Sequence, residues 1–196
     1  FINPEISKKH KKEIDIAINR LKWWEPLEYI INNAEFYSLD FYVNPNVLIP
    51  RNDTEIMVDK AIESIINIPK EVDKTPNITL IDIWTWSGCI AISILKNTFK
   101  INNSYVIDIS EKALAVSKKN IAYYKLDKKI YQLHWNLLSN FLKNKEYELD
   151  KNVILTANLP YIKNNDHVNM DLETAKFEPI LALYGWEKTW FELYEK

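Results

Sequence analysis

Two short stretches of this sequence combine residue types that could hold a substrate and a cofactor. The first is the tetrapeptide Asn158, Leu159, Pro160 and Tyr161, which follows the apolar run ending at Ala157. Proline fixes the backbone, the Asn158 side chain offers a carbonyl and an amide, and Tyr161 offers a flat ring. These groups suit a planar substrate with an NH2 group, whose hydrogens the Asn158 side-chain carbonyl and the Leu159 backbone carbonyl would accept. The alternative is a loop in which Asn and Pro only form a turn.

The second stretch is 78–91, ITLIDIWTWSGCIA, which is typical of a buried strand, a tight turn and the start of a helix. Asp82 lies near the carboxyl end of the strand, where open α/β sheets bind ligands. Such a turn usually contains glycines, because they allow positive φ and let backbone N–H groups approach a ligand closely. Here Trp84 and Trp86 stand at those places, followed by Ser87 and Gly88.

The glycine content is too low for an ordinary protein. The chain has 2 glycines and 7 tryptophans among 196 residues, whereas a usage of about 7% predicts about 14 glycines. We interpret several tryptophans as glycines encoded by UGA, a triplet that some bacterial lineages read as glycine. UGG codons at residues 84 and 86 would contradict this interpretation. Two real indoles would plug the site, and the fold would then survive only as a binding module.

The surrounding pattern predicts an α/β fold with a doubly wound, mainly parallel sheet, because strands alternate with helices. The expected strands are Ile78–Ile83, Ser104–Ile109, Ile130–His134 and Val153–Ala157, and the expected helices are Ser87–Lys96 and Glu111–Tyr124, the latter capped by Ser110. Asp108 and Asn136 fall at strand ends. A carboxylate offers paired lone pairs to a diol, so Asp108 could accept from the hydroxyl groups of a ribose. The alternative for both residues is a helix cap or a loop position.

The first 76 residues precede this pattern. We expect a basic amphipathic helix at Ser7–Lys22, a β-hairpin within Glu35–Pro45 that turns at Ser38–Asp40, and a helix after Pro50. Asn52, Asp53 or Thr54 could cap that helix, and Met57, Ala61 and Ile65 form its apolar stripe. A polar boundary follows at Pro69–Pro76.

Bulk properties exclude several classes of protein. The net charge of −2 gives no basic footprint for nucleic acid. Cys89 is a single cysteine, and His10, His134 and His167 are scattered, so we expect neither disulfides nor a metal site. No apolar run reaches the roughly 18 residues of a membrane span, and we expect no secretory signal. We therefore expect a cytoplasmic protein.

Several motifs together resemble the protein-(glutamine-N5) methyltransferases that act on peptide-chain release factors, the HemK/PrmC family. The resemblance begins near Arg20 and is carried by EPLEYI, EFYSLDFYV, VLIPRNDTE, LIDIWTWSGCIAI, YVIDIS, NLPYI and FEPILALYGWEKTWFELY. VLIPRNDTE upstream with FEPILAL downstream is the specific combination. The family has glycine where this sequence has Trp24, Trp84, Trp86, Trp135, Trp186 and Trp190, which supports the UGA interpretation. Trp23 has no clear counterpart.

This resemblance implies a Rossmann-like class I fold that binds S-adenosylmethionine and releases S-adenosylhomocysteine without a metal. It implies a small N-terminal part, with 1–33 as a remnant of a helical substrate-binding domain, 34–76 as hairpin and linker helix, and 77–196 as a C-terminally incomplete methyltransferase domain. The implied cofactor-binding residues are Asp82, Trp84, Thr85, Trp86, Ser87, Gly88, Asp108, Asn136, Leu137 and Asn158.

The same resemblance implies that Asn158, Pro160 and Tyr161 are catalytic and that Leu159 joins them in binding the substrate, a glutamine in the GGQ motif of class I release factors. Leu159 replaces the family's first proline, and Asn136 replaces an acid. The first change should be tolerated because the backbone carbonyl does the work; the second could weaken a contact to the adenine amino group. An adenine-N6 methyltransferase on DNA or RNA is the alternative, since the same loop geometry can hold an exocyclic amine.

Overall fold

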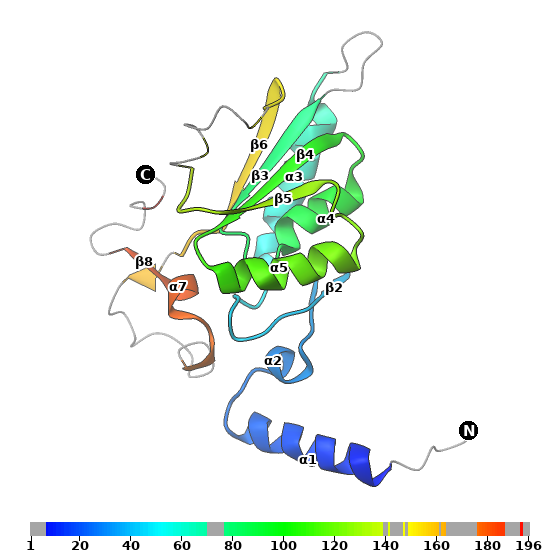
Figure 1. Cartoon of the computed structure of the whole chain (residues 1–196), viewed down its shortest axis with the longest axis vertical. Coiled ribbons are helices and arrows are strands. Elements are labelled where there is room, and N and C mark those ends of the chain that lie inside the picture. Colours follow the sequence, from blue (N-terminus) through cyan, green and yellow to red (C-terminus); the bar gives the residue numbers. More distant parts are fainter. Residues whose placement is uncertain are drawn as a thin grey trace.

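A four-stranded parallel sheet forms the centre of the computed structural model, in the order β5-β4-β3-β6 (Figure 1). The structure describes residues 7–69, 77–138, 141, 147, 149–160, 162–163, 176–186 and 193. The strands are β3 (Ile78–Ile83), β4 (Ile101–Asp108), β5 (Ile130–His134) and β6 (Asn152–Ala157). The parallel sheet that the alternating pattern predicts is therefore confirmed.

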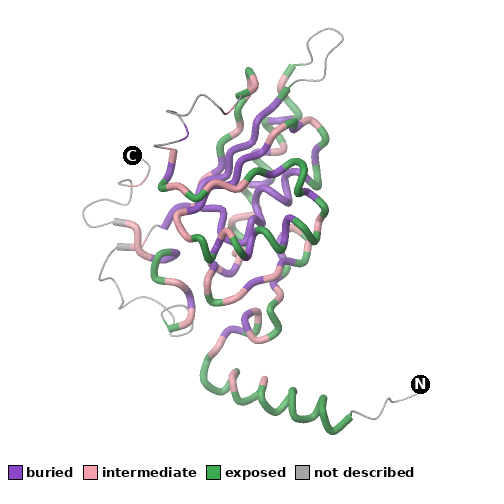
Figure 2. Tube along the Cα trace, viewed as in Figure 1, coloured by how far each residue is buried: buried purple, intermediate pink, exposed green. Residues whose placement is uncertain are grey.

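The sheet is organised around β3, whose six residues are all buried (Figure 2). Its β-branched, apolar sequence suits a strand that is covered on both faces. The chain adds β4 and then β5 on one side of β3, and only afterwards adds β6 on the other side. This reversal of strand order next to β3 is the point at which open α/β sheets form a ligand crevice.

Three helices follow the sequence pattern closely. They are α3 (Glu55–Asn67), α4 (Cys89–Asn97) and α5 (Glu111–Tyr123), and they share one apolar cluster with the sheet. The expected cap of α5 is confirmed, since the Ser110 hydroxyl accepts from the Ala113 N–H at 3.2 Å. Helix α4 begins two residues later than expected, because Gly88 takes a left-handed conformation with φ of 81°.

Two strands extend further towards their amino ends than the sequence pattern predicted. Strand β4 begins at Ile101 instead of Ser104, because Ile101 pairs with Ile78 across an irregular register step in β3. It also ends at Asp108, one residue before the expected end. Strand β6 begins at Asn152 instead of Val153, since Asn152 too pairs with Ile78. Sheet pairing, which is tertiary, sets these ends.

The hairpin consists of β1 (Ala34–Phe36) and β2 (Leu39–Phe41). Its turn residues are Tyr37 and Ser38, with φ of 52° and 56°, a pair of positive values that matches the twist of a two-residue hairpin loop. The expected turn at Ser38–Asp40 was therefore placed too late. Asp40 lies inside β2, where it pairs with Glu35.

The start of α3 also differs from the expectation. A short 3-10 turn, η1 (Asn52–Thr54), precedes the helix, and Thr54 occupies the N-cap position without a side-chain capping bond. Of the three expected cap residues, Thr54 therefore holds the N-cap position, whereas Asn52 and Asp53 lie before it in η1. The buried stripe of α3 contains Ala61 and Ile65 as expected, together with Val58, while Met57 is only partly buried.

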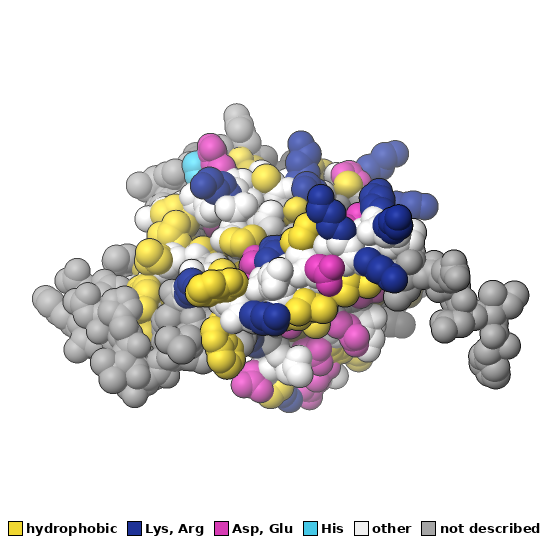
Figure 3. Space-filling model, turned by 90° about the horizontal axis from the view of Figure 1, so that it is seen from below, with side chains coloured by type: hydrophobic (Ala, Val, Ile, Leu, Met, Phe, Trp, Pro, Cys, Tyr) yellow, Lys and Arg dark blue, Asp and Glu magenta, His cyan; other side chains and the backbone are white. Residues whose placement is uncertain are grey.

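The first helix, α1 (Lys8–Lys22), has no buried residue. Its isoleucines, among them Ile14 and Ile18, are exposed beside its lysines, and the view from the α1 end shows basic and apolar side chains together (Figure 3). Helix α2 (Leu27–Ile31) follows it and buries Tyr29. The assignment of 1–33 to a substrate-binding domain stays a prediction.

The described C-terminal elements lie beside the loop that contains Asn158, Leu159 and Pro160, called the NLPY loop below. They are β7 (Ile162–Lys163), α7 (Ile180–Leu183) and β8 (Tyr184–Trp186), and β7 pairs with β8 in parallel. A Cβ atom on Gly185 would lie 2.3 Å from the Pro160 carbonyl oxygen, so this position requires glycine. Apart from Pro69, the predicted boundary at Pro69–Pro76 falls outside the described residues. Among the described helices, none is long and apolar enough to cross a membrane.

Candidate functional site

The loop after β3 holds a left-handed backbone at every second residue. Trp84, Trp86 and Gly88 have φ of 57°, 52° and 81°. The N–H groups of Trp84 and Thr85 donate to the Ile107 carbonyl at 2.7 Å and 3.1 Å, and the Gly88 N–H donates to the Thr85 carbonyl at 2.7 Å. A non-glycine residue in this conformation costs about 1–2 kcal/mol, so the backbone is that of a loop with three glycines.

The two indoles of this loop fill the space at the end of the sheet. Trp84 and Trp86 are 5% and 4% exposed, and their rings meet edge to face at 5.6 Å. The Trp86 indole N–H donates to the Asn158 carbonyl at 3.4 Å, so the ring lies between the loop after β3 and the NLPY loop. The Trp84 indole nitrogen is buried without a hydrogen-bond partner among the described residues.

These observations decide how well the loop fits a cofactor. The backbone conformation fits, but the two indoles take the room that a nucleoside and a methyl donor would need. Trp24 is a third tryptophan with a left-handed backbone, with φ of 64° just after α1. Trp23 has φ of −93°, and Trp135 is not among the residues with positive φ. As written, the side chains therefore do not fit S-adenosylmethionine, whereas glycine at residues 84 and 86 would.

Asp82 is fully buried below the loop and bonds two hydroxyl groups. Thr85 Oγ1 donates to its Oδ2 at 2.6 Å, and Thr156 Oγ1 donates to its Oδ1 at 2.7 Å. Burial raises the pKa of Asp82 from its ordinary value to about 6, against the lowering effect of these two bonds. Since Thr85 belongs to the loop and Thr156 to β6, Asp82 joins the two sides of the crevice.

Asp108 ends β4 and holds the loop from the other side. Its Oδ2 accepts from the Trp86 N–H at 3.0 Å, and its Oδ1 accepts from the Ser110 N–H at 2.9 Å. Burial raises the pKa of Asp108 to about 6, although the backbone donors lower it. Each carboxylate oxygen keeps a further lone pair, so the role as a ribose acceptor stays a prediction.

The residues expected beside the adenine lie near Asp108. The Trp135 N–H donates to the Asp108 carbonyl at 3.1 Å, which brings the next residues to the same edge of the sheet. Asn136 is exposed and Leu137 is buried, with φ of 56° for Leu137. Their contacts with a cofactor stay predictions.

The NLPY loop lies directly beside the loop after β3. Ile83 pairs with Ala157, so Trp84 and Asn158 leave neighbouring strands at the same height. Asn158 is half-buried, while Leu159 and Pro160 are buried. Tyr161 lies outside the described residues, so its position stays a prediction.

A cavity of about 530 Å³ opens beside Asn158. It is lined by Leu48, Arg51, Asp53, Thr54, Ile56, Met57, Lys60 and Asn158, so the VLIPRNDTE segment and the start of α3 form its wall. The cavity therefore joins apolar side chains to cations and a carboxylate next to the Asn158 amide.

Two motifs distant in sequence meet at this wall. Arg51 Nη2 lies 2.5 Å from Glu178 Oε1, and the Glu178 side chain is 1% exposed. The Tyr29 hydroxyl donates to the Val47 carbonyl at 2.6 Å, which holds the segment from its other side. The site thus depends on EPLEYI, VLIPRNDTE and FEP together.

Three contributions at the site were missed from the sequence: Thr156 below Asp82, the Arg51–Glu178 pair, and Asn120 of α5. Asn120 donates to the Ser87 carbonyl at 2.8 Å. A signal for Asn120 existed, because it falls on the buried stripe of α5 with Ala113, Val116 and Ser117, and an amide in such a stripe needs a partner. No comparable sequence signal indicates the other two.

The chain is similar to known proteins in fold and in sequence. No family model matches the chain. Among solved structures, the hMettl16 catalytic domain in complex with the MAT2A 3′UTR hairpin 6 has a TM-score of 0.56 at 14% identity, covering 81% of this chain and 55% of that chain. The sheet order, the loop after β3 and this likeness define the fold as that of the class I S-adenosylmethionine-dependent methyltransferases.

Within that class, the relatives in sequence are more specific. The release factor glutamine methyltransferase of Flavobacterium psychrophilum is 35% identical over 170 residues, covering 87% of this chain and 55% of the relative. That of Mycoplasma mycoides is 35% identical over 186 residues, covering 94% and 60%. The bifunctional methyltransferase of Rickettsia prowazekii is 33% identical, covering 95% and 37%. The chain belongs to the release factor glutamine methyltransferase family, and it spans 37–60% of the length of these relatives.

Proposed function

We propose that this chain is the core of an enzyme that transfers a methyl group from S-adenosylmethionine to the side-chain amide nitrogen of a glutamine in a peptide-chain release factor. The observation that carries the proposal is the pairing of Ile83 with Ala157, which leaves the loop after β3 and the NLPY loop side by side at the switch point of the sheet. The sequence relatives named above support the choice of substrate.

The roles of the chain's own residues follow from the chemistry of an amide. An amide nitrogen is a poor nucleophile because its lone pair is delocalised into the carbonyl. The Asn158 side-chain carbonyl and the Leu159 backbone carbonyl would accept its two hydrogens, orient the nitrogen and favour positive charge there. The cofactor supplies an already activated methyl group. Buried Leu159 and Pro160 help to exclude water.

The proposal requires glycine at residues 84 and 86 in the working protein. The positive φ values at both positions and the unpartnered Trp84 indole nitrogen among the described residues support it. Reading the two codons in the source DNA tests this requirement directly. UGA at both positions is the expected result, and UGG at both would favour a protein that keeps the fold without the reaction.

The enzymatic test uses the full-length protein of the source organism, with the substitutions Trp84→Gly and Trp86→Gly. It is incubated with S-adenosylmethionine and a class I release factor, and the glutamine of the GGQ motif is examined by mass spectrometry. A gain of one methyl group on that glutamine is expected. A release factor with the glutamine replaced by alanine is the control. Methylation of DNA or RNA adenine instead would overturn the assignment.

A further inference from the structure

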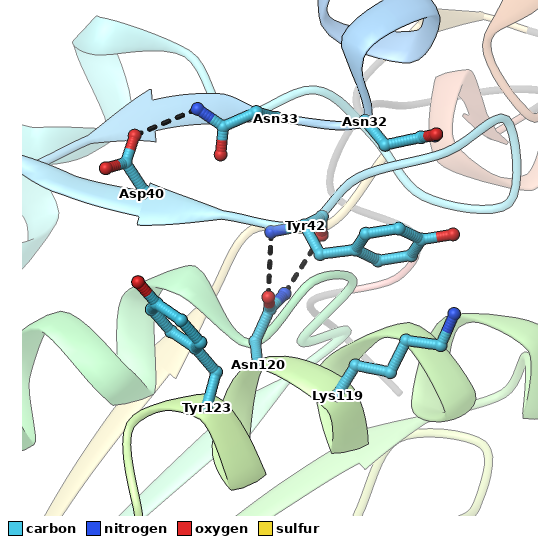
Figure 4. A pocket seen from close by; sticks show the side chains of 7 residues that line it. All are labelled: Asn32, Asn33, Asp40, Tyr42, Lys119, Asn120 and Tyr123. Carbon is cyan, nitrogen blue, oxygen red and sulfur yellow. Dashed lines mark hydrogen bonds between the residues drawn. The ribbon is translucent and has the colours of Figure 1, made fainter.

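The side chain of Asn120 bonds two segments that are far apart in the chain. It is 1% exposed. Its Nδ2 donates to the Ser87 carbonyl at 2.8 Å and to the Tyr42 carbonyl at 3.0 Å, and its Oδ1 accepts from the Tyr42 N–H at 2.8 Å. Figure 4 shows Asn120 pointing from α5 towards Tyr42, in the wall of a cavity of about 490 Å³. One amide thus satisfies three backbone groups.

The bond to Ser87 acts on the loop after β3. Ser87 lies between Trp86 and Gly88, which both have positive φ. Its carbonyl belongs to the same peptide plane as the Gly88 N–H, which donates to the Thr85 carbonyl at 2.7 Å. The plane is therefore held at both ends, and because peptide planes are rigid, Asn120 fixes its orientation.

The bonds to Tyr42 act on the segment that leads to the cavity beside Asn158. Tyr42 immediately follows β2, and the chain continues through buried Val47 and Ile49 to Arg51, which lines the cavity beside Asn158. Two other contacts hold the hairpin region on α5 and its C-cap: the hydroxyl of Tyr124, the C-cap residue, donates to the Asp40 carbonyl at 2.7 Å, and the Lys119 ammonium lies 4.1 Å from the Tyr42 ring centre. Neither of these two contacts includes the loop.

We propose that Asn120 is a positioning residue that fixes the loop after β3 relative to segment 42–51, so that the cofactor and substrate sites keep their spacing. This inference rests on the proposed function. The coupling itself, between the loop after β3 and segment 42–51, can be measured without any activity. Asn120 acts through Ser87 and Tyr42 and contacts neither substrate nor cofactor itself.

The first test is hydrogen–deuterium exchange, which needs neither activity nor cofactor. Asn120→Asp keeps the acceptor for Tyr42 but loses both donated bonds, and Asn120→Ala loses all three. Exchange in residues 84–88 should rise about tenfold in both variants, because buried backbone carbonyls lose their donors. Tyr124→Phe is the matched control: it removes a bond between α5 and the hairpin without touching the loop, so only exchange near Asp40 should rise.

The second test measures affinity for S-adenosylhomocysteine by calorimetry in the chain with Trp84→Gly and Trp86→Gly. Adding Asn120→Asp should weaken binding about tenfold, whereas adding Tyr124→Phe should leave it unchanged. Absence of binding in the parent itself would refute the proposed function and leave the exchange result to judge Asn120. Equal effects of the Asn120 and Tyr124 variants on loop exchange would show that Asn120 is only a structural residue.

A third measurement needs no substitution, so its result does not depend on whether a variant folds. In the unsubstituted chain at low denaturant, the amides of Trp86, Gly88 and Tyr42 should exchange with the same opening free energy, as one cooperative unit. Independent opening of the loop and of Tyr42 would overturn the coupling.

Discussion

Arg51 and Glu178, 127 residues apart in the chain, form an ion pair of 2.5 Å at the wall of the cavity beside Asn158. The Glu178 side chain is 1% exposed and that of Arg51 is 42% exposed, so the carboxylate is buried and the cation faces the cavity. Removing one partner of a buried pair is costly, because the remaining charge keeps its desolvation penalty.

The first prediction therefore concerns stability. Arg51→Met should lower the free energy of unfolding by about 3 kcal/mol, the low end for a buried pair because Arg51 is partly in water. Glu178→Gln should cost less, since it removes the buried charge. Urea unfolding measures both. Lys60→Met is the matched control: its pair with Glu63 is 72% and 59% exposed, so a loss of at most about 0.5 kcal/mol is expected. Equal losses at Arg51 and Lys60 would contradict the prediction.

The second prediction uses two neighbouring tryptophans at the end of α1. The Trp24 N–H donates to the Leu21 carbonyl and the Glu25 N–H to the Arg20 carbonyl, a pattern that places left-handed Trp24 where helices usually have glycine. Trp24→Gly should raise stability by about 1 kcal/mol. Trp23→Gly, also at an exposed position but with φ of −93°, should lower it by about 0.5–1 kcal/mol. Thermal unfolding followed by circular dichroism measures the two shifts, and a stabilising Trp23→Gly would argue against backbone strain as the cause.

The third prediction concerns pH and Asp82. Burial raises its pKa from 3.8 to about 6, so the folded state binds a proton that the unfolded state has already released between these values. The ionisation of buried Asp82 does not affect the free energy of unfolding below about pH 4. It lowers that free energy increasingly between pH 4 and pH 6, and the loss stays constant at higher pH. The stability of Asp82→Asn relative to the parent should thus rise by on the order of 2–3 kcal/mol from pH 4 to pH 7. Urea unfolding across this range measures it, and a pH-independent difference would refute the raised pKa.

The fourth prediction separates catalysis from cofactor binding. In the chain with Trp84→Gly and Trp86→Gly, Asn158→Ala should abolish methyl transfer, because the amide nitrogen loses an acceptor that orients it. S-adenosylhomocysteine affinity, measured by calorimetry, should remain within about threefold, since the Asn158 backbone is unchanged. Loss of both activity and affinity, with a lower melting temperature, would indicate a structural role instead.

The sequence alone determined the sheet and much of the loop after β3. Strands Ile78–Ile83 and Ile130–His134 have the predicted bounds, because local apolar, β-branched runs decide where a buried strand can lie. The shortage of glycine also indicates Trp84 and Trp86, and both have positive φ values in the structure. The α5 cap at Ser110 is also predictable from local sequence, because a cap is formed within four residues.

Tertiary structure decided everything that depends on contacts between distant segments. The turn at Tyr37–Ser38 and the first residue of β4 follow from which residues pair across strands, and no local preference contains that register. Arg51 meets Glu178, Thr156 meets Asp82, and Asn120 joins Ser87 to Tyr42 only once the sheet has brought these elements together. Residue types and local periodicity can indicate which groups a site uses; their distances are fixed by the order in which β3, β4 and β6 pack.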